Sequence, residues 1–326
     1  MTFQGFDFDT WLSLPTSILL NEAWRVRRQY FDNKIFFSAP GTKGYENEYY
    51  RNNRNRFVAI SLTGTSCALN CDHCQKKLLH SMLSCTTPEK LLDTVKELQA
   101  EGCQGILLSG GADKSGAVPL GPFMEAIKKI KTWGLKIIVH TGLVSEEIIA
   151  GLKQADVDQV LVDVIGARET IRDVYHLDYG PEVYQSFLDL CQQYQLEVAP
   201  HIVVGLHYGR INGEIEALKM ISNAQPRHVV VVVLTPLRGT PMARVTLPSV
   251  EKCGRIIALA RLANPRAQLS LGCARPAGYE RPLLEQFAIN AGVNAIAYPS
   301  PETIRLAREM ALEIEFNDRC CTLADE

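Results

Sequence analysis

The chain has 326 residues, a formal net charge of −2, 46% hydrophobic residues and 21% charged residues. These values are typical of a globular protein with a full core, and the near-neutral charge argues against a nucleic-acid partner. We expect no membrane span, because no apolar run approaches the roughly 20 residues that cross a bilayer. The start of the chain is neither basic nor followed by an apolar run, so we expect a cytoplasmic protein without a secretory leader.

The predicted elements begin with an N-terminal extension over residues 1–56, which contains a helix at 12–30, a short strand at 35–37 and a polar loop from 41 to 56. From residue 57 onward, short apolar runs alternate with amphipathic stretches; the runs lie at 57–62, 105–109, 136–140, 159–163, 197–203, 228–234, 268–271 and 294–298. Eight strands alternating with helices predict an α/β fold, a closed (β/α)8 barrel of TIM type over residues 57–312. Residues 313–326 are then a C-terminal tail.

Barrels of this type place their active sites at the carboxyl ends of the strands. Polar side chains at or just after the predicted strand ends are Ser109, His140, Asp163, His201, Thr235 and Cys273. The two histidines and Asp163 each remain open between binding a ligand and serving as hydrogen-bonded structural residues.

Three cysteines follow the first barrel strand, Cys67, Cys71 and Cys74, with the spacing C-x3-C-x2-C. Three thiolates within eight residues can bind a cubic iron–sulfur cluster and leave one iron without a protein ligand. A zinc site, with His73 or His80 as fourth ligand, would be closed by protein ligands. The position of the motif after an apolar strand favours the cluster over zinc or coincidence.

The triad resembles the signature of the radical S-adenosylmethionine (radical SAM) superfamily, which implies a [4Fe–4S] cluster and S-adenosylmethionine as cofactors. An aromatic residue usually precedes the third cysteine there and stacks near the adenine; His73 occupies that position. The resemblance implies further binding roles for Ser109, Gly110 and Gly111 at the methionine amino group, Asp163 at the ribose, and Val203 and Gly205 against the adenine. One departure is Ala112, since an acidic residue usually follows the glycines.

Residues 57 to about 312 resemble biotin synthase and its relatives, which hold a second cluster inside the barrel with three cysteines and an arginine. By alignment, Leu108, Ile138 and Ala199 occupy the three cysteine positions and Cys273 the arginine position. The second cluster therefore cannot be built in the same way, and we do not expect biotin formation.

The tail carries Cys320 and Cys321 after Arg319, which resembles the Arg-Ser-Ser tail of lipoyl synthase. The whole chain looks like the biotin synthase-like proteins that act as components of two-component lipoyl synthases. We therefore expect an auxiliary iron–sulfur cluster, the sulfur donor, held by Cys273, Cys320 and Cys321, with Cys85 as a weaker candidate. The competing interpretation of the Cys-Cys pair is a frayed tail.

The resemblance implies a transferase that inserts sulfur at an unactivated carbon of an octanoylated lipoyl-carrier protein. The implied partners are that carrier, a low-potential electron donor such as ferredoxin or flavodoxin, and a second radical SAM protein. The loop from 41 to 56 either meets the carrier or is a solvated linker. Two alternatives stay open: a biotin synthase-like enzyme without sulfur insertion, which matures a metal cofactor or rearranges an amino acid, and a non-enzymatic iron–sulfur or zinc scaffold.

Overall fold

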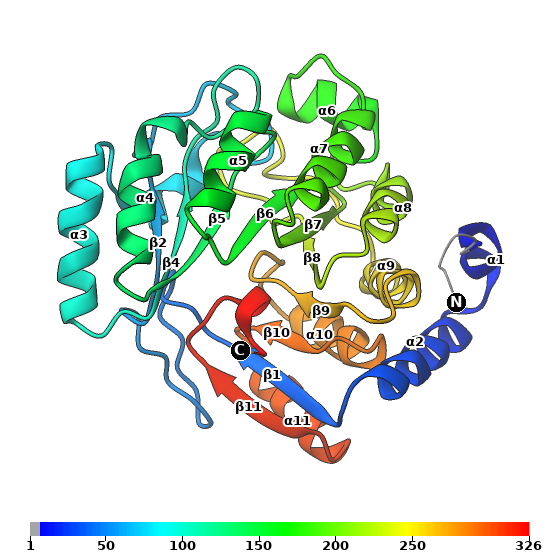
Figure 1. Ribbon diagram of the computed structural model, residues 1–326. Helices are drawn as coiled ribbons and strands as arrows, with labels where there is room; N and C mark the ends of the chain where they lie inside the picture. Colours follow the sequence, from blue (N-terminus) through cyan, green and yellow to red (C-terminus); the bar gives the residue numbers. More distant parts are fainter. Residues whose placement is uncertain (1–6, 326) are drawn as a thin grey trace.

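The computed structural model describes residues 7–325; residues 1–6 of the extension and residue 326 of the tail lie outside the described part. Eleven parallel strands form one curved sheet, with the helices on its outer side and the C-terminal segment on its concave side (Figure 1). Among the helices of residues 7–325, none combines the length and the apolar character that a bilayer crossing requires.

The strands are β1 (Lys34–Ser38), β2 (Phe57–Ser61), β3 (Leu83–Ser84), β4 (Gly105–Ser109), β5 (Lys136–His140), β6 (Gln159–Asp163), β7 (Val198–Val204), β8 (His228–Val233), β9 (Gln268–Leu271), β10 (Ala295–Ala297) and β11 (Glu313–Asn317). The α-helices are α1 (Phe8–Ser13), α2 (Thr16–Tyr30), α3 (Pro88–Ala100), α4 (Met124–Lys131), α5 (Glu146–Gln154), α6 (Arg168–Tyr175), α7 (Glu182–Gln193), α8 (Glu214–Ala224), α9 (Val250–Ala263), α10 (Glu280–Asn290) and α11 (Pro301–Glu309). Short 3-10 helices are η1 (Lys77–Ser81), η2 (Gly121–Phe123) and η3 (Cys321–Leu323).

The TIM-type α/β fold is confirmed, because each of the eight predicted apolar runs contains a strand and the strands are parallel. The sheet departs from a closed ring of eight strands. Its order is β11-β1-β10-β9-β8-β7-β6-β5-β4-β2-β3, so β1 lies between β10 and β11, and the described pairs end at β11 and β3. The N-terminal strand β1 and the tail strand β11 thus extend one edge of a half-barrel.

Strand residues alternate between the helix layer and the concave side, as the period of two requires. Leu107 pairs in register with Ile138 and packs with it on the concave side, whereas Leu108 is buried in the helix layer. The alignment that put Leu108 beside Ile138 and Ala199 is therefore wrong by one residue. A shift of one position along a strand moves a side chain to the opposite face.

The C-terminal segment folds into the concave side of the sheet. Leu323 is buried against Ile138, Leu161 and Ala199, and the hydroxyl of Ser270 donates a hydrogen bond to the carbonyl of Cys321 over 2.9 Å. The tail is therefore part of the core, and the frayed-tail interpretation is wrong.

The loop between β1 and β2 packs against this segment. Tyr50 stacks on Phe316 and donates a hydrogen bond to Asp318 over 2.8 Å, and Tyr45 donates to the carbonyl of Pro299. These contacts show a loop that braces the edge of the sheet rather than a solvated linker.

Candidate active site

The cysteine loop lies at the carboxyl end of β2. Cys67, Cys71 and Cys74 line one cavity of about 240 Å³. The amides of Cys74 and Gln75 both donate to the carbonyl of Cys71, which winds the loop into a tight turn before η1. All three thiols are thereby brought to one wall of the cavity.

The electrostatics of the loop favour a thiolate at Cys74. The hydrogen bond from Cys71, supported by His73, lowers the pKa of Cys74 to about 4 although burial opposes the shift. The same hydrogen bond and burial raise the pKa of Cys71. Metal binding requires deprotonated thiols. Cys74 is already a thiolate, and the other two cysteines deprotonate as the metal binds.

The loop does not have the geometry of a single-ion site. Among residues 7–325, no three His, Cys, Asp or Glu side chains converge so that they could hold one metal ion. In a cubic cluster each thiolate binds a different iron, so the three thiols need not converge on one point. His73 has a ring centroid 5.2 Å from that of Tyr175, and its buried Nδ1 has no hydrogen-bond partner.

The glycine segment after β4 packs directly against the cysteine loop. Ser109, Gly110 and Gly111 line the cavity, and the amide of Gly111 donates to the hydroxyl of Thr63 over 2.6 Å. A Cβ on Gly111 would lie 2.0 Å from the carbonyl oxygen of Ser66 and 2.5 Å from Cβ of Cys67. Glycine is required there because the two backbones approach too closely for any side chain.

Three polar residues follow on the concave side, His140 at the end of β5, Asp163 at the end of β6 and His201 on β7. Nε2 of His140 is 3.6 Å from Oδ1 of Asp163, and the rings of the two histidines are 5.8 Å apart. Burial opposes ionisation of Asp163, but contact with His140 outweighs it and lowers the pKa of the carboxyl to about 2. Asp163 is therefore an anion in the wall of the cavity.

The two histidines respond in opposite directions. Burial alone would lower the pKa of His140, but the Asp163 carboxylate outweighs it and raises that pKa. Burial lowers the pKa of His201 to about 4, so this ring is neutral at physiological pH and keeps a contact of 2.9 Å to the carbonyl of Ala199. These three side chains thus differ in charge: Asp163 is an anion, His140 binds a proton more readily than a free histidine, and His201 is neutral.

Two of the predicted binding residues lie elsewhere. Val203 lines a separate small cavity beside Glu214, and Gly205 sits in the turn after β7 with φ +79° and donates its amide to Glu214 over 2.8 Å. The cavity instead includes three tyrosines that sequence reasoning missed, Tyr175, Tyr179 and Tyr184. They belong to α6, α7 and the loop between them, and nothing in an amphipathic pattern distinguishes such residues from core residues.

The tail thiols gather at the concave side near the end of β9. A hydrogen bond from Cys321, aided by Thr322, lowers the pKa of Cys320 to about 6 against the effect of burial. Cys273 is accessible to solvent, but the protein atoms around its thiol and the nearby Cys320 raise the pKa of this thiol. Cys320 is also within electrostatic range of His140. Cys85 does not join this group, because it is fully buried in the helix-layer core.

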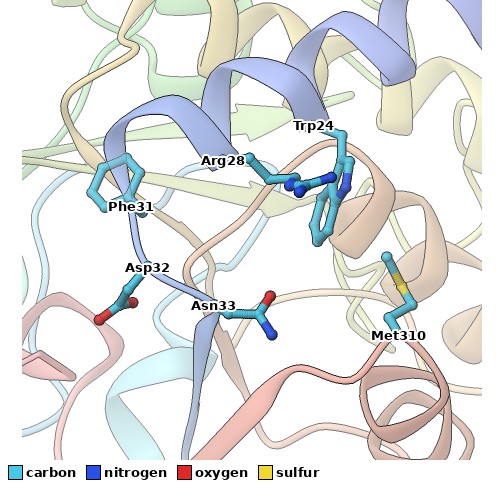
Figure 2. A pocket seen from close by; sticks show the side chains of 6 residues that line it. All are labelled: Trp24, Arg28, Phe31, Asp32, Asn33 and Met310. Carbon is cyan, nitrogen blue, oxygen red and sulfur yellow. The ribbon is translucent and has the colours of Figure 1, made fainter.

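A larger cavity of about 580 Å³ lies at the opposite end of the strands. Figure 2 shows its lining, with Trp24 and Arg28 extending from α2 and Met310 facing them. It adjoins the residues before β1 and β11, at the amino ends of the sheet. Because active sites of this architecture form at the carboxyl ends, the cavity with the cysteine loop is the candidate site.

Comparison with known families decides the identity of the cysteine loop. Residues 61–233, more than half of the chain, match the Radical SAM superfamily. The chain belongs to the radical SAM superfamily. Residues 231–313 match the Biotin and Thiamin Synthesis associated domain. Both domains together make the chain similar in organisation to its curated relatives.

Curated relatives of this radical SAM protein include biotin synthases. That of Cupriavidus necator is 25% identical over 310 residues, which cover 88% of this chain and 79% of the relative. That of Ruthia magnifica is 24% identical over 299 residues, which cover 88% of this chain and 84% of the relative.

Solved structures with the same fold include methylornithine synthase, with a TM-score of 0.63, 19% identity and 96% coverage of both chains. HydG, a maturase of the [FeFe]-hydrogenase, has a TM-score of 0.60 and 16% identity, over 91% of this chain and 63% of its own. At these identities the likeness concerns the fold alone.

Membership of the radical SAM superfamily implies a [4Fe–4S] cluster and S-adenosylmethionine, and the cavity fits both. Three thiols share one wall, Cys74 is prepared as a thiolate, and the absence of a side chain at Gly111 lets the glycine segment pack against the cysteine loop. The unpartnered Nδ1 of His73 is a buried polar group that a ligand can satisfy.

Proposed function

We propose that this radical SAM enzyme is a lipoyl synthase component that inserts sulfur into the octanoyl chain of a lipoyl-carrier protein. The observation that carries the proposal is the place of the tail: Cys320 and Cys321 are built into the concave side of the sheet, near Cys273. Thiols buried at the mouth of a radical SAM barrel are well placed to hold a second, auxiliary cluster.

The first site would be formed by Cys67, Cys71 and Cys74. A [4Fe–4S] cluster held there, with S-adenosylmethionine, supplies radical chemistry when bound. The chain contributes the thiolates, the close approach of Gly111 to the cysteine loop, and the Asp163 carboxylate in the same cavity. Asp163 remains charged across the physiological range and can accept hydrogen bonds from ligand hydroxyls.

The second site would be formed by Cys273, Cys320 and Cys321. A cluster held there would supply the sulfur. Cys320 is a thiolate at neutral pH because its pKa is lowered to about 6, whereas burial and the Cys320 hydrogen bond raise the pKa of Cys321. The two neighbouring thiols therefore differ in how easily they deprotonate, which favours Cys320 as the first ligand and Cys321 as the weaker one.

The concave wall suits an aliphatic substrate. Leu143, Val162 and Leu177 line the cavity beside the cysteine loop, and an octanoyl chain presents only methylene groups to such side chains. The proposed partners are the octanoylated carrier, a low-potential ferredoxin or flavodoxin as electron donor, and a second radical SAM protein that completes lipoyl formation.

A second candidate function keeps the radical chemistry without sulfur insertion, as in cofactor maturation or amino-acid rearrangement. One observation favours it. Leu323 fills the space beside Ile138 and Ala199, so in this arrangement the deep interior has an aliphatic plug where the biotin synthase resemblance places cluster ligands. If the tail thiols bind no cluster, the chain has only one.

The test is anaerobic reconstitution followed by iron and sulfide analysis and reaction with dithionite, S-adenosylmethionine and an octanoylated carrier peptide. The proposal expects about eight irons per chain and a mass gain from sulfur. Cys273→Ala and Cys320→Ala should lower the iron content to about four and abolish the mass gain while deoxyadenosine still forms.

The matched control is Cys191→Ala, which removes a thiol buried in α7. It should keep both the iron content and the sulfur insertion. Wild-type protein with about four irons and deoxyadenosine formation would favour the sulfur-free alternative. Sulfur insertion by both thiol variants would overturn the assignment of the auxiliary site.

A further inference from the structure

Asp72 lies inside the cysteine motif, between Cys71 and His73, and has contacts outside the motif. Its Oδ2 accepts a hydrogen bond of 2.7 Å from the hydroxyl of Tyr208, and its Oδ1 is 3.0 Å from Nε2 of His176. Its amide donates to the carbonyl of Val174 over 2.9 Å. A single residue of the cysteine loop is thus tied to two distant segments.

Tyr208 belongs to the loop after β7. It follows Gly205 by three residues, and the amide of Gly209 donates to the carbonyl of Gly205 over 2.8 Å, which closes a tight turn around it. Burial, followed by the contact with Asp72, raises the pKa of Tyr208 to about 12, so the hydroxyl keeps its proton at neutral pH. The turn at residues 205–209 therefore holds the Tyr208 hydroxyl in place as a hydrogen-bond donor.

The end of α6 is the common support. His176 caps this helix in the left-handed conformation with φ +60°, which directs its backbone out of the helix beside Asp72. The carbonyl of Asp173 lies 3.0 Å from the Tyr208 hydroxyl, next to the Val174 carbonyl that accepts the Asp72 amide. The cysteine loop, the end of α6 and the loop after β7 thus meet at the carboxylate of Asp72.

We propose that Asp72 is a positioning residue that locks the cysteine loop to the Gly205 turn through Tyr208 and to the end of α6 through His176. The inference rests on the proposed role of the cavity as the S-adenosylmethionine site and is independent of the final substrate. The cysteine loop and the Gly205 turn come from opposite ends of the matched radical SAM region. Fixing their relative position holds Cys71 and His73 against Tyr175 and Leu177 at the end of α6, which line the same cavity.

The consequence is a division between cluster binding and ligand binding. The thiols remain in one loop when the hydroxyl of Tyr208 is removed, so iron binding should persist. The cysteine loop should then be less firmly held relative to the Gly205 turn. Binding of S-adenosylmethionine would have to restrict this added freedom, which weakens the affinity. A lost hydrogen bond to a carboxylate predicts a rise of about 10- to 100-fold in Kd.

The experiment compares Tyr208→Phe with Tyr194→Phe in the reconstituted full chain. Tyr194 is a matched control because its hydroxyl also donates to a carboxylate, Glu146, over 2.8 Å, on the exposed surface. Iron content and equilibrium binding of S-adenosylmethionine are measured for each variant. Hydrogen exchange of the cysteine loop and the Gly205 turn is followed in the protein before reconstitution, which gives a readout separate from activity.

The expected result for Tyr208→Phe is wild-type iron, weaker S-adenosylmethionine binding and faster exchange in both segments, with the control unchanged. Asp72→Asn, which keeps one acceptor oxygen, should show a smaller effect than Asp72→Ala. Unchanged Kd and exchange in Tyr208→Phe would overturn the proposal. A parallel loss of iron and of S-adenosylmethionine binding would also overturn the proposal. In that case the contact would serve only to fold the cysteine loop.

Binding and exchange need no octanoylated peptide, so these outcomes do not depend on which reaction the enzyme catalyses. A wild-type protein that forms deoxyadenosine but no sulfur product would refute the lipoyl proposal and leave this one standing.

Discussion

Gly111→Ala should separate the cysteine loop from the glycine segment. The new Cβ would lie 2.0 Å from the carbonyl oxygen of Ser66 and 2.6 Å from Cα of Cys67, both in the backbone. Ordinary contact begins at 3.4 Å, so the Ser66 oxygen must retreat by about 1.4 Å. No flexible side chain is available to absorb this movement.

The size of the effect follows from the precision that metal ligands require. Thiolates tolerate errors of about 0.2 Å in ligand distance, far less than the displacement needed at Cys67. Overpacking of this kind costs about 1–3 kcal/mol, which lowers the binding constant for the cluster by about 5- to 150-fold. The remaining core is untouched, so the thermal unfolding of the protein before reconstitution should change little.

The assay is iron and sulfide content per chain after anaerobic reconstitution, together with the circular dichroism melt. Gly121→Ala is the matched control, because its Cβ would meet only Cδ1 of Ile148 at 3.6 Å. If Gly111→Ala binds as much iron as Gly121→Ala, the close approach of the two segments does not position Cys67, and the reasoning is refuted.

Three further changes test other parts of the molecule. Glu285→Gln leaves the buried Arg275 without its carboxylate and should lower the free energy of unfolding by about 3–5 kcal/mol in urea titrations; a loss below about 1 kcal/mol would contradict this. The neutral His201 takes up a proton on unfolding between its unfolded pKa of about 6.5 and its folded pKa of about 4, so stability falls as pH falls through this window. His201→Gln should reduce that slope, and an identical slope would contradict the assignment. Asp325→Asn weakens the 3.1 Å contact with His228 and should speed hydrogen exchange of the tail; unchanged exchange would show that Leu323 alone holds it.

The eight strands between residues 57 and 298 were predictable from sequence because each apolar run is bounded by polar stretches and a parallel sheet buries both of its faces. The strand at 35–37 was also predicted, but its neighbours were not. Placement of β1 between β10 and β11 depends on pairing across more than 250 residues, which no local pattern encodes. The same limit explains why a ring of eight was expected where an open sheet formed.

The candidate site was predictable where chemistry is local. Cys67, Cys71 and Cys74 are close in sequence and therefore close in space, and the glycine segment after β4 lines the same cavity. Burial of the tail was unpredictable, because Leu323 looks like any residue of a polar terminal segment until its partners are known. Asp72 was passed over because a carboxylate within a cysteine motif has no signature of its own.

The route by which the tail reaches the concave side explains why the first strand matters to the site. β11 pairs only with β1 among the described strands, and the amide of Ala39, just after β1, donates to the carbonyl of Asn317 over 2.8 Å. Cys320 follows Asn317 by three residues, so the position of its thiol is set by β1 rather than by the strands that carry the first cysteine site. Because β1 pairs with β10, the N-terminal extension links the tail thiols to the frame that holds Cys273. Loss of β1 should therefore affect the proposed auxiliary site before it affects Cys67, Cys71 and Cys74.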